Sequence, residues 1–196
     1  MKLSRQAWTA LRAMIVLTVV CGIVYPAAIW VVGLAMPSQS NGSLVTQSGT
    51  VVCSSLIGQS FTDKKGNALP QWFQSRPSAA GDGYDGAASS GSNYGPENKD
   101  LIAAIKDRQA AIEKLDGVAK GQIPADAVTA SASGLDPDIS EAYALLQVAR
   151  VAQARGLDES RVRALVESHV EGRELGYLGE RDVELQHVHR RLAGLG

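Results

Sequence analysis

The chain has 196 residues, with 19 Lys and Arg against 20 Asp and Glu, and a formal net charge of -1. This balance argues against a strongly basic surface of the kind that attracts nucleic acid, so we expect no nucleic-acid partner. Of the two cysteines, Cys21 lies inside an apolar run and Cys53 lies beyond it, which excludes a disulfide framework.

An uncharged apolar run dominates the N-terminal part of the sequence. It extends from Ala13 to Met36, 24 positions, and contains Pro26 near its middle. At 1.5 Å per residue a helix of this length spans about 36 Å, which exceeds the roughly 30 Å hydrocarbon core of a bilayer. The run predicts one transmembrane helix over 13–36 with contact to membrane lipid, and a kink at Pro26.

The charges that flank this run predict its orientation. Lys2, Arg5 and Arg12 precede the run, whereas the next charged residue after it is Asp63. The positive-inside rule therefore predicts a cytoplasmic N-terminus at 1–12 and an extracytoplasmic domain over 37–196.

A cleavable signal peptide is the alternative interpretation of the same run. The small residues of Gly33-Leu34-Ala35 resemble a cleavage site, and a basic segment precedes the run. However, the apolar segment exceeds the usual 7–15 residues, and Trp8 and Trp30 suit the two interfaces of a retained helix. We therefore expect a membrane anchor.

The remaining sequence predicts β-structure first and helices later. Two β-rich runs, 43–47 and 50–57, flank Ser48-Gly49 and predict a hairpin. From 62 to 98 the chain is dense in Gly, Ser, Asn, Pro and Asp, which predicts a long loop that is either functional or disordered.

Three helices are predicted after this loop. Leu101, Ile102, Ile105, Ile112 and Leu115 have close to helical spacing. A second helix is predicted from an Asp136 cap to Gly156, with an apolar face formed by Ile139, Ala142, Tyr143, Leu146 and Ala149. A third begins after Asp158, with Val162, Leu165, Val166 and His169 on one side. The fold class is thus α+β: one transmembrane helix, then a single domain with a small antiparallel sheet and about three helices.

No motif for catalysis or metal binding is present in the sequence. The phosphate-loop pattern is missing, and Gly117–Gly121 has the wrong spacing to cradle phosphates. The sequence contains no nucleophile elbow, and its three histidines have no cysteine partners nearby. We therefore predict no catalytic residue, no metal site and no cofactor bound by this chain itself.

Two polar, glycine-containing regions stand out instead. The first joins Arg76-Pro77-Ser78-Ala79 to 90–98, and the second covers 129–137. Such loops recognise partners, but Asn93, Ser131 and Ser133 also suit the alternative in which they satisfy only their own turns and caps.

Motifs in these regions are similar to one known family. The agreeing stretches are Ser55–Phe61, Trp72-Phe73 with 76–79, 90–93 with Gly95-Pro96, 128–137, 147–152 and 154–157. In this order behind one membrane span, they resemble the C subunit of the Kdp-type potassium-transporting P-type ATPase. The chain departs from the family at Cys53, where a glycine is usual, and at 182–186, where a Val-Asn-Val-Leu-type strand is usual.

The resemblance implies a non-catalytic accessory subunit of a high-affinity potassium uptake pump in the bacterial inner (plasma) membrane. It implies a potassium-translocating subunit and an ATP-hydrolysing subunit as partners, with ATP, Mg and potassium handled by the complex. The implied role is assembly and catalytic chaperoning, which raises the ATP affinity of the hydrolytic subunit. Gln147 matches a family glutamine proposed to act at nucleotide.

From these regions and the resemblance together we expect a set of partner-facing residues: Trp72, Phe73, Arg76, Asn93, Thr129, Ser131, Ser133, Gly134, Leu135 and Asp136. Among them, Trp72, Phe73 and Leu135 are the expected apolar anchors. Two alternatives stay open: an independent membrane-tethered binding module that uses the same loops, and a tethered hydrolase with an unfamiliar arrangement of groups.

Overall fold

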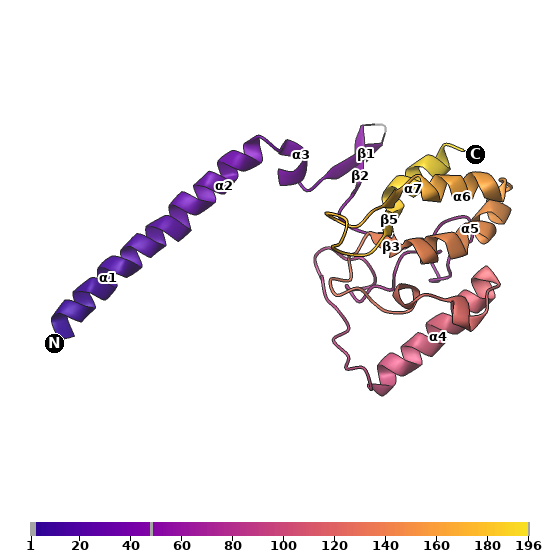
Figure 1. Ribbon diagram of the computed structural model, residues 1–196, viewed down its shortest axis with the longest axis horizontal. Coiled ribbons are helices and arrows are strands. Elements are labelled where there is room, and N and C mark those ends of the chain that lie inside the picture. The colour runs from indigo at the N-terminus through magenta and orange to yellow at the C-terminus, as the bar shows by residue number, and fades with distance from the viewer. Residues whose placement is uncertain (1–2, 48, 196) are drawn as a thin grey trace. The chain divides into compact units, whose positions relative to one another are not determined.

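The computed structural model describes residues 3–47 and 49–195. The chain divides into two compact units, Met1–Ser54 and Ser55–Gly196, and we call the second the C-terminal domain. Figure 1 shows the order of the elements along the chain.

A single long helix forms most of the first unit. It consists of α1 (Leu3–Val19), the π-helical turn η1 (Val20–Val24) and α2 (Tyr25–Leu34), 32 residues in all. It is the one helix among the described residues that is long and apolar enough to cross a membrane. It covers most of the predicted span and begins earlier, at Leu3.

The helix continues through Pro26 by changing its hydrogen-bond pattern. Pro26 lies in the first turn of α2, and η1 immediately precedes it. The amide of Tyr25 donates to the carbonyl of Val20, five residues earlier, as in a π-helix. Because proline has no N–H, the ordinary ladder is interrupted there, and the π-helical turn is the irregularity that accompanies this interruption.

The predicted hairpin near the helix is confirmed. After the short α3 (Pro37–Ser40), β1 (Leu44–Gln47) pairs antiparallel with β2 (Thr50–Ser54), and Gln47 lies opposite Thr50. A bulge shifts the register between Val45 and Thr46. The second strand ends three residues before the predicted Ile57, and Ser48 of the predicted turn lies outside the described residues.

The C-terminal domain begins with the predicted long loop. Between 62 and 98 the structure has no helix or strand, apart from an isolated bridge of Thr62 with Ala68. The first predicted helix follows as α4 (Lys99–Asp116), capped by the Asn98 side chain, which accepts from the amides of Asp100 and Leu101.

The start of the second predicted helix is wrong. The 3₁₀ turns η2 (Lys120–Gln122) and η3 (Ala125–Ala127) lead to a strand, β3 (Asp138–Ser140), and only then to α5 (Glu141–Arg155). Ile139 pairs with Val183 and is buried, so this residue belongs to a sheet, and the Ser140 hydroxyl caps the helix by accepting from the amide of Tyr143. The predicted end at Gly156 is confirmed, with φ of +65°.

The sheet and the last helix lie in the C-terminal part of the chain. The third predicted helix is α6 (Glu159–Glu167), capped by Asp158. It is followed by β4 (Val170–Glu171), β5 (Asp182–Glu184) and α7 (Leu185–Ala193). The strands form an antiparallel sheet in the order β3-β5-β4. The helices α5, α6 and α7 lie together beside β3 and β5 (Figure 1), and the core consists of their apolar faces together with Phe73.

One face of this sheet carries closely spaced carboxylates. Asp138 lies opposite Glu184, and Glu171 lies opposite Asp182, while Val183 between them is buried. Like charges directly opposite each other destabilise a strand pair. Burial, and after it the negative charge of Asp182, raise the pKa of Asp138 to about 7.

Replacing Asp138 by asparagine should make the stability of the C-terminal domain less sensitive to rising pH. A carboxyl whose pKa is higher in the folded than in the unfolded protein stabilises below its unfolded pKa and loses that contribution as the pH rises through the folded value. We expect the melting temperature of D138N, measured relative to the unmodified chain, to rise between about pH 4 and pH 7, where the carboxyl of Asp138 is ionised in the unfolded chain and still protonated in the folded one. Circular dichroism melts across this range test this, with D107N on the surface of α4 as the control. Equal slopes for all three proteins would contradict the prediction.

Candidate functional site

The two polar regions singled out in the sequence meet in the C-terminal domain. Hydrogen bonds join them to each other and to the segment after β2, among them Gly58 N to Leu135 O at 2.9 Å, Ser90 N to Ser133 O at 3.0 Å, and Ser78 Oγ to Gly134 O at 2.6 Å. We call this arrangement, formed by residues 58, 76–80, 89–91 and 131–136, the loop junction. It brings together segments that are up to 78 positions apart in sequence, counted from 58 to 136.

Glycines allow these segments to approach closely. A Cβ atom on Gly134 would lie 2.6 Å from Ser90 O and 2.8 Å from Ala80 N. A Cβ atom on Gly91 would lie 2.7 Å from the carbonyl oxygen of Ala132. The junction therefore requires glycine at these positions, because a side chain would not fit. At Gly134 the positive φ of +68° also favours glycine.

An ion pair closes one side of the junction. Arg76 and Asp136 are in contact at 2.8 Å, and both side chains are about three-quarters buried. The Tyr84 hydroxyl donates to Arg76 O at 2.7 Å, and burial raises the pKa of this phenol to about 12. Asp136 also accepts from the amide of Asp138, so its side chain forms a turn and an ion pair in place of the predicted helix cap.

The remaining polar candidates bond to residues near them in sequence. Asn93 is exposed, has a φ of +53°, and donates to Gly91 O. Ser133 Oγ accepts from the amide of Leu135, and Thr129 Oγ1 donates to Ala125 O. Ser131 is the exception: it is buried, and its backbone amide donates to Pro77 O in the other polar region. The side chains of Asn93 and Ser133 serve their own turns, as the alternative interpretation expects, and that of Thr129 does the same.

The three expected apolar anchors have different environments. Phe73 has no exposed surface and lies in the core, so it cannot face a partner. Trp72 is half-buried beneath the guanidinium of Arg155, whose Cζ lies 4.3 Å from the ring centroid. Leu135 is half-buried in the junction. The sequence alone does not show which ring of a Trp-Phe pair in a polar loop lies in the core; here it is that of Phe73.

Helix α5 fixes the chain on which Trp72 and Phe73 lie. Gln147 has no exposed surface; its Oε1 accepts from Gln74 N at 2.6 Å, and its Nε2 donates to Gln74 O at 3.1 Å. The side chain therefore pairs with the Gln74 backbone as a neighbouring strand would. These hydrogen bonds of the Gln147 side-chain amide are thus made inside the domain.

Arg150 completes this attachment. Its Nε pairs with Asp116 Oδ1 at 2.7 Å, and the two side chains are 6% and 2% exposed. Its other nitrogens donate to Pro70 O at 2.6 Å, to Trp72 O at 2.9 Å and to Gln147 Oε1 at 2.6 Å. Burial raises the pKa of Asp116, and the hydrogen bond and charge of Arg150 oppose that rise.

These contacts correct the predicted orientation of the second helix. Ala142 and Ala149, expected on its buried face, are exposed, whereas Gln147 and Arg150 are buried. The reason is that the 70–76 segment has no regular structure, so its carbonyls and amides need side-chain partners, which α5 supplies. An apolar periodicity argument assigns such polar side chains to the solvent.

The aromatic cluster around Trp72 includes a residue that sequence analysis did not select. His189 of α7 is buried, with its ring centroid 4.0 Å from that of Phe61 and 5.3 Å from that of Trp72. Burial lowers the pKa of His189 to about 3, which keeps the ring neutral near pH 7. The spacing of Leu185, Val188 and Leu192 was the signal that could have revealed this helix.

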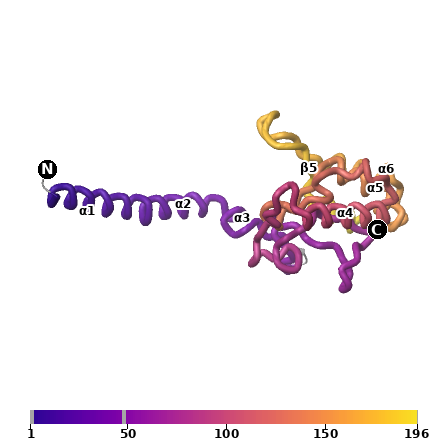
Figure 2. Tube along the Cα trace, turned by 90° about the horizontal axis from the view of Figure 1, so that it is seen from below, coloured from indigo at the N-terminus to yellow at the C-terminus, as the bar shows by residue number. Residues whose placement is uncertain are grey.

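A second unselected feature is the connection between β4 and β5. It projects from the domain (Figure 2), and Leu175 and Tyr177 near its tip are 78% and 69% exposed. Arg173 and Glu180 pair across its base at 3.1 Å. We call residues 172–181 the projecting loop. Exposed apolar side chains on a formed loop are typical of interaction surfaces.

Comparisons with known proteins identify relatives over nearly the whole chain. A family model described as "K+-transporting ATPase, c chain" matches residues 7–193. A Kineococcus radiotolerans protein is 51% identical over 183 residues, covering 93% of this chain and 90% of its own length. A Mycobacterium tuberculosis protein is 49% identical, covering 92% and 94%, and a Caulobacter vibrioides protein is 50% identical, covering 93% and 90%. All three are named "Potassium-transporting ATPase KdpC subunit".

Proposed function

The chain belongs to the KdpC family, the c chain of the K+-transporting ATPase, and from this we propose that it is a non-catalytic accessory subunit of an ATP-driven potassium uptake pump. The observation that carries the proposal is the family match over residues 7–193, which includes both the apolar helix and the C-terminal domain. Its partners are the potassium-translocating and ATP-hydrolysing subunits, which handle potassium, ATP and Mg.

The proposal places the long helix across the inner membrane. Residues 13–36 form the span, the basic residues before it keep 1–12 in the cytoplasm, and 37–196 lies outside. The length and composition of the helix support a single pass. The π-helical turn at Val20–Val24 offers a local irregularity for contact with a partner helix.

A domain outside the membrane acts on a cytoplasmic ATP site only through other subunits. We therefore propose that it raises ATP affinity by stabilising a conformation of the complex, which is a coupling free energy between distant sites. Gln147 contributes to this coupling by fixing the 70–76 segment, because its amide is buried and already paired with Gln74.

Two surfaces are proposed to contact the pump. The loop junction has a defined shape because hydrogen bonds and the Arg76–Asp136 pair fix its segments. The projecting loop offers Leu175 and Tyr177, the two most exposed large apolar side chains of the C-terminal domain among the described residues. Large apolar and aromatic side chains dominate the energetics of protein interfaces.

The experiment compares the pump purified with and without this chain. Potassium-stimulated ATP hydrolysis is measured as a function of ATP concentration for each preparation. Failure of assembly, or a higher apparent KM for ATP without the chain, supports the accessory role. An intact pump with unchanged kinetics would contradict it and favour an independent tethered binding module.

A further inference from the structure

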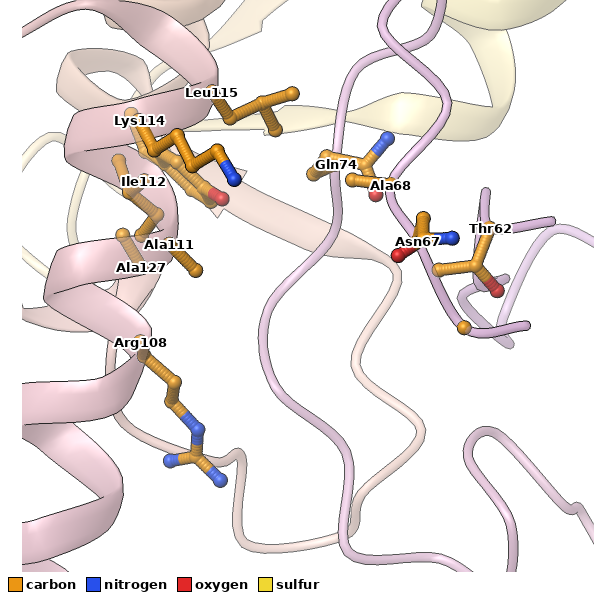
Figure 3. Close-up of a pocket in the computed structure, with 12 residues that line it drawn as sticks. Thr62, Asn67, Ala68, Gln74, Arg108, Ala111, Ile112, Lys114, Leu115 and Ala127 are labelled. Carbon is orange, nitrogen blue, oxygen red and sulfur yellow. The ribbon is translucent and has the colours of Figure 1, made fainter.

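A cavity of about 540 Å³ lies between α4 and the loop that contains residues 62–74 (Figure 3). Ala111, Ile112 and Leu115 of α4 form an apolar wall, and Thr62, Asn67 and Gln74 belong to the opposite, polar wall. This volume is within the usual range for small-molecule sites. The cavity is separate from the loop junction, since it shares none of the junction's residues.

A buried phenol opens into this cavity. Tyr143 is 3% exposed and lines the cavity. Burial raises the pKa of Tyr143 well above its usual value, so the hydroxyl keeps its proton and can donate. A phenolic O–H is a hydrogen-bond donor, and Tyr143 therefore adds a donor to the lining of the cavity.

The charged side chains that line the cavity are both positive. Arg108 and Lys114 reach from α4 into the cavity (Figure 3), and none of the described lining residues carries a carboxylate. One guanidinium nitrogen of Arg108 donates to Val128 O at 2.8 Å, which anchors the side chain while other N–H groups remain available. Burial lowers the pKa of Arg108, so this cation is partly desolvated.

The opposite wall is held in place by its own hydrogen bonds. Gln74 Nε2 donates to the carbonyls of Phe61 and Leu69, both at 3.1 Å. Asp63 accepts from the amide and the side-chain nitrogen of Asn67, both at 2.9 Å. The site is therefore formed before any ligand enters, which reduces the entropy cost of binding.

We propose that this cavity binds a small organic oxyanion, a carboxylate or phosphate head joined to a short apolar body. The head pairs with Arg108 or Lys114 and accepts a hydrogen bond from the Tyr143 hydroxyl, while the body lies on Ala111, Ile112 and Leu115. This site is independent of the proposed role in the pump, because neither membrane topology nor partner subunits enter the argument.

The test uses the full chain in nanodiscs of zwitterionic lipid, with empty nanodiscs as the blank, and isothermal titration calorimetry. The probes are hexanoate and hexyl phosphate, with inorganic phosphate as the head alone and hexanol as the body alone. We expect both complete probes to bind with a dissociation constant on the order of 0.1–1 mM and each half to bind at least about tenfold more weakly.

Three variants assign the binding to this cavity. K114Q and R108Q should each weaken hexanoate binding about tenfold, and Y143F, which removes one hydroxyl, about threefold to tenfold. R163Q, at an exposed arginine of α6, is the matched control. The melting temperature of each variant shows whether it is folded. If R108Q does not fold, K114Q still tests the contribution of a cation, because Lys114 is exposed and its replacement should not affect folding. Absence of binding above the blank, equal binding of hexanol, or full affinity in K114Q and Y143F would overturn the proposal.

Discussion

Replacing Arg150 by methionine is expected to destabilise the C-terminal domain by about 3–5 kcal/mol, the usual cost of leaving a buried charge without its partner. The variant keeps the length of the side chain but leaves Asp116, which is 2% exposed, without its cation. It also removes the guanidinium that donates to Pro70 O and Trp72 O, inside a segment that has no regular structure. The melting temperature should fall on the order of 10 °C in thermal denaturation followed by circular dichroism.

Two further variants separate the ion pair from a general loss of side-chain volume. R163M removes an exposed arginine whose pair with Glu159 lies at 3.1 Å, and it should cost at most about 1 kcal/mol. Adding D116N to R150M removes the uncompensated charge, so the double variant should be more stable than R150M alone. A double variant that is less stable than R150M by the full cost of D116N would show that the two side chains are not coupled.

Substituting alanine for Gly134 is expected to cost about 2–4 kcal/mol and to weaken assembly of the pump. The new methyl group would lie 2.6 Å from Ser90 O and 2.9 Å from Ala80 Cβ, and alanine is strained at a φ of +68°. Because Gly134 packs against both the 76–80 and the 89–91 segments of the loop junction, these contacts must separate before the methyl group fits. Urea denaturation measures the stability, and the yield of purified complex measures the assembly.

Gly117 offers a matched control for this prediction. It has the same φ of +68° at the end of α4, but a Cβ atom there would have no neighbour within 4 Å. G117A should therefore cost only the backbone strain, about 1 kcal/mol, and leave assembly unchanged. If G134A and G117A have equal effects, close packing of the loop junction does not contribute to stability or assembly.

Local signals predicted much of the fold correctly. The apolar run, the hairpin, α4 and the caps at Asp158 and Gly156 depend on residues that are neighbours in sequence. The strand β3 was missed because the Asp136-Pro137-Asp138 pattern suits a helix start equally well. Only the distant Val183, across the sheet, determines that Ile139 is extended.

The candidate site was predicted as two loops but not as one junction. Composition identified the polar stretches, yet the bonds from Ser78 to Gly134 and from Gly58 to Leu135 join residues 56 and 77 positions apart, counted from 78 to 134 and from 58 to 135. Sequence patterns carry no signal for such pairings in a single chain. The same limit applies to Gln147, which periodicity assigns to a helix surface and the structure places in the interior.

The pairing of Gln147 with Gln74 should slow hydrogen exchange at the Gln74 amide, in the irregular 70–76 segment. The amide hydrogen of Gln74 is bonded to a side chain with no exposed surface, and the Arg150–Asp116 pair lies behind it. Its exchange with deuterated solvent requires the opening of α5 itself, so it should proceed as slowly as exchange in the helical core. A stretch of chain without helix or strand thus belongs to the most slowly opening part of the domain.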